Sequence, residues 1–352
     1  MKITLAATKK TKPDFSALGF GRYFTDHMLV MDYRDGAWQE MKIVPFQNFE
    51  MSPATNVLHY AQGIFEGAKA YKNPETGAIS VFRIKENLKR MNRSAARLSM
   101  PELDEKAVKK GLFELLRLER DWIPTSPGTS LYIRPTLIAT EEVLGVHASK
   151  FYKFFIILSP VGAYYANGLA PTKIKVEEFY ARSVMGGTGE AKCMANYSIS
   201  LLAAEVAKKD GFDQVLWLDG AKKKFVEEVG AMNIFFVIDG VVVTPKLTGT
   251  FLPGITRRSC IEILKKLKAY PVKESKLTIE QIAKAHAEGR LTECFGTGTA
   301  AVVAPVGLIR YKGKDMTLNN GKIGEVTKYL YDTLTGIQYG KIKDPFNWVE
   351  QV

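Results

Sequence analysis

Short apolar runs of strand length alternate with segments of helical periodicity along the whole chain, and this pattern limits the folds open to it. One predicted hairpin covers residues 67–83, with a turn at the N-P-E-T-G sequence of residues 73–77. Further strands are predicted at residues 130–139, 152–158, 173–178, 214–218, 225–229, 233–238, 241–243 and 301–306. Helices are predicted at residues 88–98, 107–117, 196–208, 255–267 and 326–337, and another begins with a capping box at Thr278. The mixture predicts an α+β protein.

The length of 352 residues predicts two domains, since a domain holds roughly 150 residues. The segment 159–172 contains two prolines, two glycines and an asparagine between apolar strands, which is typical of a connection. We therefore expect a smaller N-terminal domain over residues 1–158, an interdomain loop over 159–172 and a larger C-terminal domain over 173–352. An ordinary hairpin loop at 159–172 would have the same composition and is an equal alternative.

Composition excludes several classes of protein. Apolar residues make up 46% of the chain and charged residues 24%, and no apolar run reaches the ~20 residues that span a bilayer. The N-terminus has only a short apolar stretch before lysines return, too short for a signal peptide, so we expect a cytoplasmic protein. Three cysteines far apart and four scattered histidines predict neither a disulfide scaffold nor a metal site.

The net charge of +12 has two interpretations. A nucleic-acid surface needs basic residues gathered on one face with aromatic residues among them. Here short lysine clusters are spread along the chain, at residues 9–10, 109–110, 222–224 and 265–266. This spread favours a solvated surface over nucleic-acid binding, and a positive field also attracts anionic ligands.

The sequence G-G-T-G-E-A-K at residues 186–192 is a glycine-rich stretch that ends in a lysine. A nucleotide-binding phosphate loop needs Gly before that lysine and Ser or Thr after it, whereas Ala191 and Cys193 stand here. A flexible turn with a solvated lysine is the simplest alternative. Small and apolar neighbours nevertheless favour burial of Lys192, which would lower its pKa and suit a nucleophile toward an aldehyde.

Two acidic residues, Glu227 and Glu228, interrupt an apolar strand pattern. Alternation along a strand places them on opposite faces, so one is expected to face inward. A buried carboxylate needs a cationic partner, and either a protonated pyridine nitrogen or a lysine would serve.

Three further segments could bind anions. The sequence L-P-G-I-T-R-R at residues 252–258 opens a predicted helix, whose free backbone N–H groups and dipole favour an anion. The sequence F-G-T-G-T-A at residues 295–300 offers hydroxyls and amides, although a tight turn has the same composition. Tyr132 and Arg134 share one face of a predicted strand, where an arginine usually finds a carboxylate unless the strand is an exposed edge.

Taken in order, the motifs resemble those of the branched-chain amino-acid aminotransferases, which are class IV, fold-type IV pyridoxal-phosphate enzymes. The motifs include F-T-D-H-M, F-E-G-A-K-A, S-L-Y-I-R-P, G-G-T-G-E-A-K-C-M-A-N-Y, E-E-V-G-A-M-N, L-P-G-I-T-R and F-G-T-G-T-A. The resemblance covers nearly the whole chain. It implies a D-amino-acid-aminotransferase-like fold of two α/β domains with pyridoxal 5′-phosphate at their interface, in a homodimer that needs no metal, membrane or nucleic acid.

The resemblance assigns cofactor-binding roles by position. Lys192 resembles the Schiff-base lysine, which also moves the proton between the substrate Cα and the cofactor. Glu228 resembles the partner of the pyridine nitrogen, and Tyr197 resembles the residue that hydrogen-bonds the phenolic oxygen. The phosphate-binding positions are those of Arg83, Ile255, Thr256 and Thr299.

The implied substrates are leucine, isoleucine, valine, glutamate and their 2-oxo acids. One pocket must accept an aliphatic side chain and then a charged one, and a single arginine in an apolar lining solves this problem. Arg134 and Tyr132 resemble the site for the distal carboxylate, and the amides of Thr299 and Ala300 resemble that for the α-carboxylate. The positions of the apolar walls are those of Phe20, Phe65, Tyr164 and, from a second subunit, Tyr60.

The chain departs from some relatives at a few positions. Ala301 and Ala304 stand where some carry a C-x-x-C redox pair, so thiol regulation is not expected there. Ala231 stands where some have a threonine, and Arg182 matches an arginine to which the sequence assigns no role. D-Amino-acid aminotransferase and aminodeoxychorismate lyase share the fold and stay open as alternatives, although L-Y-I-R-P and E-V-G-A-M-N favour the branched-chain group.

Overall fold

The computed structural model of the chain describes residues 1–162 and 169–352, and these divide into two compact units. Among the described residues, unit 1 comprises 1–162, 191–194 and 337–352, and unit 2 comprises 169–190 and 195–336. From the sequence, residues 191–194 and 337–352 are instead expected in the C-terminal domain. Main-chain pairing explains the difference: the Met194 nitrogen donates to the Gly63 carbonyl at 3.0 Å, and the last strand joins a sheet edge of unit 1.

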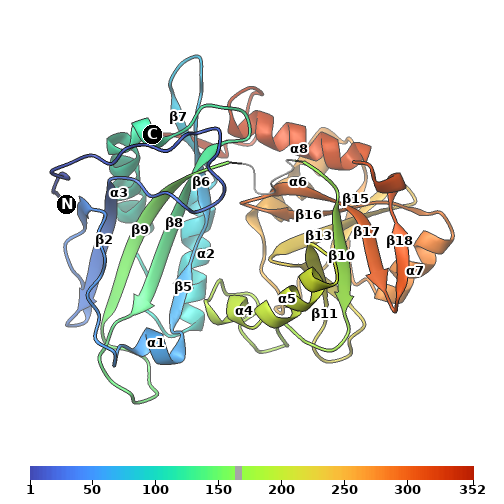
Figure 1. Cartoon of the computed structure of the whole chain (residues 1–352), viewed down its shortest axis with the longest axis horizontal. Helices are drawn as coiled ribbons and strands as arrows, with labels where there is room; N and C mark the ends of the chain where they lie inside the picture. Colours follow the sequence, from blue (N-terminus) through green and yellow to red (C-terminus); the bar gives the residue numbers. More distant parts are fainter. Residues whose placement is uncertain (163–168) are drawn as a thin grey trace. The chain divides into compact units, whose positions relative to one another are not determined.

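Unit 1 is built on a ten-stranded sheet (Figure 1). Its main path runs β1-β4-β2-β9-β8-β6-β7-β19, with β3 beside β2 and β5 beside β8. The pair β1–β4 is parallel and the other neighbours on this path are antiparallel. The strands are β1 (Lys2–Ile3), β2 (His27–Arg34), β3 (Ala37–Trp38), β4 (Lys42–Pro45), β5 (Gly63–Phe65), β6 (Ala68–Lys72), β7 (Ile79–Phe82), β8 (Ser130–Ala139), β9 (Tyr152–Val161) and β19 (Val349–Gln351).

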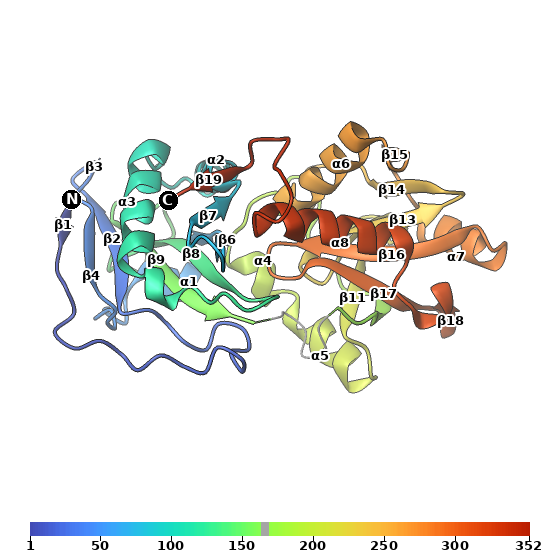
Figure 2. The ribbon, with the colours of Figure 1, turned by 90° about the horizontal axis from the view of Figure 1, so that it is seen from above.

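Helices α2 (Ile84–Arg97) and α3 (Glu105–Leu118) cover one face of this sheet (Figure 2). Their apolar stripes, which include Leu88 of α2 and Leu112 of α3, are buried in one cluster with strand residues. Helix α3 begins where Asp104 accepts hydrogen bonds from two backbone N–H groups of the first turn, at 2.9 and 3.1 Å. The other helical segments of this unit are α1 (Asn56–Tyr60) and η1 (Arg120–Trp122).

Unit 2 contains a nine-stranded sheet in which six strands close on themselves. Pairing runs β12-β11-β10-β17-β16-β13, and β13 also pairs with β12, so these strands form a small barrel. β14 and β15 continue the sheet beyond β13, and β18 lies beside β17. The strands are β10 (Thr172–Glu177), β11 (Gln214–Leu218), β12 (Val226–Val229), β13 (Met232–Ile238), β14 (Val241–Pro245), β15 (Val272–Ser275), β16 (Leu291–Gly298), β17 (Val302–Tyr311) and β18 (Lys314–Thr317).

The remaining helices follow unit 2 strands in the chain. The capping box predicted at Thr278 is confirmed. The single helix predicted at 196–208 is wrong, because the Ser200 hydroxyl donates to the Tyr197 carbonyl at 2.7 Å and the chain breaks there into two helices. The helices are α4 (Ala195–Ser198), α5 (Leu201–Lys209), α6 (Ile255–Leu267), α7 (Ile279–Ala287), η2 (Asn319–Gly321) and α8 (Glu325–Gln338).

The α+β class predicted from the sequence is confirmed. The predicted hairpin is present as β6 and β7, joined by a turn in which the Asn73 side chain accepts from the Glu75 and Thr76 nitrogens. In the part of the chain that the structure describes, no helix has the length and apolarity to cross a membrane. Within the same residues, no three potential metal-ligating side chains come together.

Candidate active site

Lys192 lies in unit 1, on a short segment that pairs with strand β5. The carbonyl of Lys192 accepts from the Phe65 nitrogen at 3.0 Å, and its own nitrogen donates to the Ser94 hydroxyl at 2.9 Å. Both neighbours, Ala191 and Cys193, are buried, whereas Lys192 is only partly buried. Hydrogen bonds therefore fix the main chain around Lys192, while its side chain remains partly accessible to solvent.

Five residues that the sequence analysis assigns to the site gather in unit 1. The Lys192 ammonium lies 4.9 Å from the centroid of the Phe65 ring, and the Arg134 guanidinium lies 4.6 Å from the same centroid. Arg134 also donates to the Tyr132 hydroxyl at 3.1 Å, and the rings of Tyr132 and Phe20 meet edge to face at 5.0 Å. Two cations thus share one aromatic ring, which leaves a positively charged, aromatic surface suited to a carboxylate.

Glu66 also lies beside this cluster, and it was not predicted from the sequence. Its side chain is fully buried beside Phe65 in the chain and pairs with Arg90, whose Nε donates to it at 2.7 Å. Asn87 donates a further hydrogen bond at 2.8 Å. Burial alone would raise the pKa of Glu66, but Arg90, Lys192 and Asn87 together hold it below its usual range. The only sequence signal was an acidic residue within the apolar F-E-G motif.

The other predicted residues of unit 1 lie in different settings. Arg83 is buried at the N-terminus of α2 with a φ of 51°, and its guanidinium stacks 4.6 Å from the Trp348 ring centroid. Tyr60 is exposed on α1 and donates its hydroxyl to the Leu144 carbonyl. Tyr164 lies outside the described residues.

In unit 2, Glu228 on strand β12 pairs with Arg182. The Arg182 guanidinium donates to one Glu228 oxygen, and the Asn233 side chain lies 3.4 Å from the other. The same guanidinium lies 5.3 Å from the ring centroid of Tyr197 on α4. An ion pair with a guanidinium favours the ionised carboxylate. Arg182, to which the sequence assigned no role, therefore holds two predicted site residues.

The prediction that only one of the two glutamates of β12 faces inward is wrong, because Glu227 and Glu228 are both buried. Alternation still directs them to opposite faces of the strand, but Thr250 covers the Glu227 face and donates its hydroxyl to the carboxyl group. Burial raises the pKa of Glu227 to about 7, and the neighbouring charges of Glu228 and Asp219 add to the rise.

The start of helix α6 offers a cradle for an anion. The N-cap residue is Gly254, which has no side chain, so among the described residues no N-cap side chain accepts from the N–H groups at Ile255 and Thr256. A Cβ on Gly254 would lie 1.9 Å from the Asn233 amide oxygen, so only glycine fits there. Thr297 pairs with Asn233 from the adjacent strand β16, and its hydroxyl is buried without a hydrogen-bond partner among the described residues. Such an orphaned group is a donor for a bound ligand.

Thr299 and Ala300 lie in the turn that follows β16, and both are partly buried. Unit 1 contains an amine and a guanidinium on aromatic faces, and unit 2 contains a carboxylate paired with a guanidinium, together with backbone amides and hydroxyls. By chemistry alone, the unit 1 groups suit an aldehyde and a carboxylate, and the unit 2 groups suit a basic ring nitrogen and a phosphate.

Residues 63–309 match the model of the amino-transferase class IV family. The chain is also similar to curated proteins over nearly its full length. It is 54% identical to a probable branched-chain-amino-acid aminotransferase of Staphylococcus epidermidis, covering 97% of this chain and 96% of that protein. It is 52% identical to branched-chain-amino-acid aminotransferase 2 of Bacillus subtilis, covering 100% and 97%.

A solved structure extends this similarity to the fold. The T.th. branched-chain amino acid aminotransferase, complexed with N-(5′-phosphopyridoxyl)-L-glutamate, superposes with a TM-score of 0.71 at 28% identity. The match covers 91% of this chain and 97% of that one.

Proposed function

This chain belongs to the class IV aminotransferase family, and from that premise we propose what its own residues do. It is a branched-chain-amino-acid transaminase, with the α+β fold of two units described above. Its reaction moves an amino group reversibly between leucine, isoleucine or valine and 2-oxoglutarate.

The cofactor in this proposal is pyridoxal 5′-phosphate, supported by the phosphopyridoxyl adduct of the T.th. relative and by the donor set of this chain. When bound, pyridoxal phosphate acts as an electron sink for the substrate Cα. Lys192 holds the cofactor through its Nζ and, when released, moves the proton at Cα. Glu228, kept ionised by Arg182, holds a proton on the ring nitrogen. Tyr197 donates to the phenolic oxygen.

Phosphate binding falls to the uncapped start of helix α6. The N–H groups at Ile255 and Thr256 and the hydroxyl of Thr299 bind the phosphate oxygens, and the buried Arg83 adds a guanidinium. These groups orient the cofactor and take no part in proton transfer.

The substrate site alternates between two kinds of side chain. Phe20 and Phe65 contact an aliphatic side chain, and Tyr60 and Tyr164 complete the walls in this proposal. Arg134 binds the distal carboxylate of glutamate and otherwise stays stacked on Phe65, so its charge is never left without a partner. The amides of Thr299 and Ala300 bind the α-carboxylate.

A homodimer also forms part of the proposal. Leu58, Leu144 and Val146 of unit 1 are 61%, 62% and 83% exposed, and the Leu144 carbonyl accepts from the hydroxyl of Tyr60, two residues after Leu58. Exposed apolar side chains on neighbouring segments are typical of an interaction surface. The cytoplasmic location expected from the sequence stays a prediction.

The observation that carries the proposal is the stacking of Lys192 and Arg134 on Phe65, because it sets the amine beside a carboxylate-binding cation. The direct test is Lys192→Ala. The purified variant is expected to lose the visible absorbance of bound pyridoxal phosphate and nearly all activity. Lys208→Ala, at an exposed lysine of α5, is the matched control and should keep both. Retained turnover in Lys192→Ala would refute the assignment.

Substrate choice is tested separately with half-reactions of the wild-type enzyme. L-Leucine is expected to convert the bound cofactor to its amino form within the assay, and D-alanine is not. Conversion by D-alanine alone would favour the fold-sharing D-amino-acid aminotransferases instead.

A further inference from the structure

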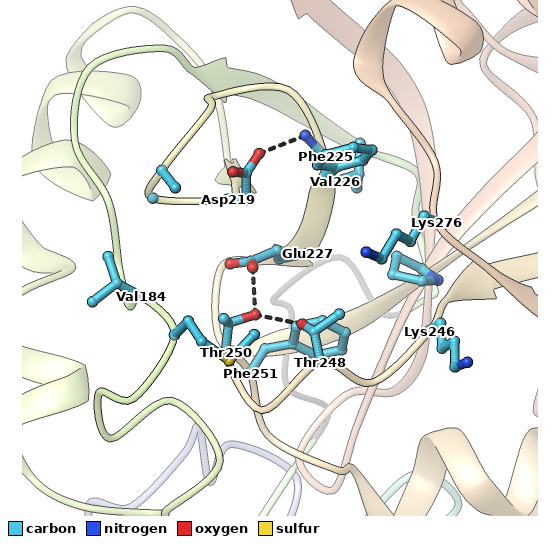
Figure 3. Close-up of a pocket in the computed structure, with 14 residues that line it drawn as sticks. Val184, Asp219, Phe225, Val226, Glu227, Lys246, Thr248, Thr250, Phe251 and Lys276 are labelled. Atoms are coloured by element: carbon cyan, nitrogen blue, oxygen red, sulfur yellow. Dashed lines mark hydrogen bonds between the residues drawn. The ribbon is translucent and has the colours of Figure 1, made fainter.

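A cavity of about 150 Å³ lies within unit 2, on the side of β12 where Glu227 points (Figure 3). Its walls are largely apolar and include Val184, Val226 and Phe251. A cavity of ~150 Å³ lined by apolar groups is large enough to hold a benzene ring. None of its lining residues belongs to the cofactor or substrate positions assigned above.

The acidic groups of the cavity are already held by the protein. Thr250 donates to Glu227, and the hydroxyls of Thr250 and Thr248 lie 2.7 Å apart, so these groups form one hydrogen-bonded chain (Figure 3). Asp219 accepts from the backbone nitrogens of Lys222, Lys224 and Phe225 at 2.7 to 2.8 Å. Its charge is therefore stabilised mainly by the amides of its own turn, and Lys223 adds an electrostatic attraction.

The two cationic side chains that line the cavity are less well partnered. Lys246 and Lys276 line it, and neither forms an ion pair with a carboxylate among the residues that the structure describes. In Figure 3 the Lys276 ammonium is directed back toward the cavity, 5.8 Å from the Phe225 ring centroid. The nearby Lys223 ammonium has no hydrogen-bond partner within the described part of the chain, but it is attracted by the charges of Glu177, Asp219 and Glu227 and so is already partnered.

We propose that this cavity binds a small monocarboxylate with an apolar body. Lys276 holds the carboxylate, and the hydrocarbon part fills the space between Val184, Val226 and Phe251. An apolar body matches these walls, and a single negative charge matches the cations. A neutral hydrocarbon would form no ion pair with Lys276, and a cation would be repelled by Lys246 and Lys276.

A ligand bound in this cavity would order the chain segments that connect it to the proposed cofactor-binding residues. This consequence rests on the proposed function. Glu227 directly precedes Glu228 in β12. The segment 246–251 forms one wall and continues into Gly254 at the start of α6. A Cβ on Gly189 would lie 2.0 Å from the Thr250 carbonyl oxygen, so the loop before Lys192 also packs on this segment. A bound ligand therefore orders the loop that carries the phosphate-binding amides.

The test is isothermal titration calorimetry of the purified holoenzyme with benzoate, and with benzamide as its neutral isostere. Benzoate is expected to bind at least about tenfold more tightly than benzamide. Lys276 is itself exposed, so Lys276→Ala is expected to weaken benzoate binding about threefold to fivefold, whereas Lys273→Ala, at an exposed lysine of β15, should leave it unchanged. Ala221→Phe, which places a large ring at the lining of the cavity, is expected to abolish binding.

A carboxylate can also enter the proposed substrate site, so Arg134→Ala is part of the same series. Benzoate binding that survives Arg134→Ala and falls with Lys276→Ala supports the inference, whatever the activity of either variant. Binding that falls with Arg134→Ala and is indifferent to Lys276→Ala overturns it, as does equal binding of benzamide or no binding at all. Hydrogen exchange gives a second measurement: saturating benzoate is expected to slow exchange at the amides of 248–251 about tenfold in wild type, but not in Ala221→Phe.

Discussion

Two buried glutamates, one in each unit, experience opposite electrostatic surroundings. Glu66 of unit 1 has a guanidinium at 2.7 Å, and its pKa lies below the usual range despite full burial. Glu227 of unit 2 has a hydroxyl as its hydrogen-bond donor, and burial raises its pKa to about 7. Burial is common to both, so the charge of the partner decides which form of the carboxyl group is stable.

Glu228 extends this comparison by a single residue along β12. It is as buried as Glu227, yet it pairs with Arg182 and so resembles Glu66 in its surroundings. One strand thus presents a charged carboxylate on one face and a carboxyl group that titrates near neutral pH on the other. Substitutions that remove the charge of each glutamate, or of its partner, should therefore change stability and activity to different extents.

The largest expected effect comes from removing the partner of Glu66. Arg90→Met leaves a buried carboxylate without its cation and is expected to lower the free energy of unfolding by about 3–5 kcal/mol. The measurement is chemical denaturation at neutral pH. Arg93→Met, at an exposed arginine of the same helix, is the control and should change stability by less than ~0.5 kcal/mol. Equal effects of the two substitutions would contradict the role of Arg90.

The next largest effect is a difference in activity between substitutions on the two faces of β12. Glu228→Gln removes the negative charge proposed to hold the ring proton, and kcat is expected to fall about 100-fold to 1000-fold. Glu227→Gln keeps the acceptor for Thr250 and should retain most of the activity. Steady-state rates with L-leucine and 2-oxoglutarate check both variants. A loss confined to Glu227→Gln would reverse the assignment of the two faces.

The smallest effect concerns the pH dependence of stability. The folded-state pKa of Glu227 lies above the ordinary glutamate value near 4.5, so its neutral form stabilises the fold below that value. This contribution is lost as the pH rises through about 7. Glu227→Gln is therefore expected to raise the free energy of unfolding by about 1–3 kcal/mol at pH 8.5 and to change it little near pH 4.5. Denaturation curves at the two pH values measure this difference, and a gain independent of pH would exclude titration of Glu227 as its cause.

Much of the local structure follows from the sequence because it depends on neighbouring residues. The helix predicted at 255–267 is found as Ile255–Leu267, since Pro-Gly precedes it and apolar residues repeat at helical spacing. The strand predicted at 130–139 is found as Ser130–Ala139. The cluster of Lys192, Phe65 and Arg134 joins residues that the family motifs had marked.

Long-range pairing could not be predicted in the same way. Strand β19 joins β7 from the far end of the chain, and the residues around Lys192 pair with β5 of unit 1, so neither belongs to the unit that its sequence position suggests. The Arg182–Glu228 and Arg90–Glu66 pairs also join distant or separate segments. No periodicity in the sequence carries information about which cation reaches which carboxylate.

Lys192 is proposed as the amine that binds pyridoxal phosphate, and reductive trapping tests this role most directly. The holoenzyme is treated with borohydride and digested, and the modified peptide is identified by mass spectrometry. We predict a phosphopyridoxyl group on the peptide that contains Lys192. Modification instead at Lys69, a fully buried lysine whose pKa burial lowers to about 8, or at no lysine, would contradict the account.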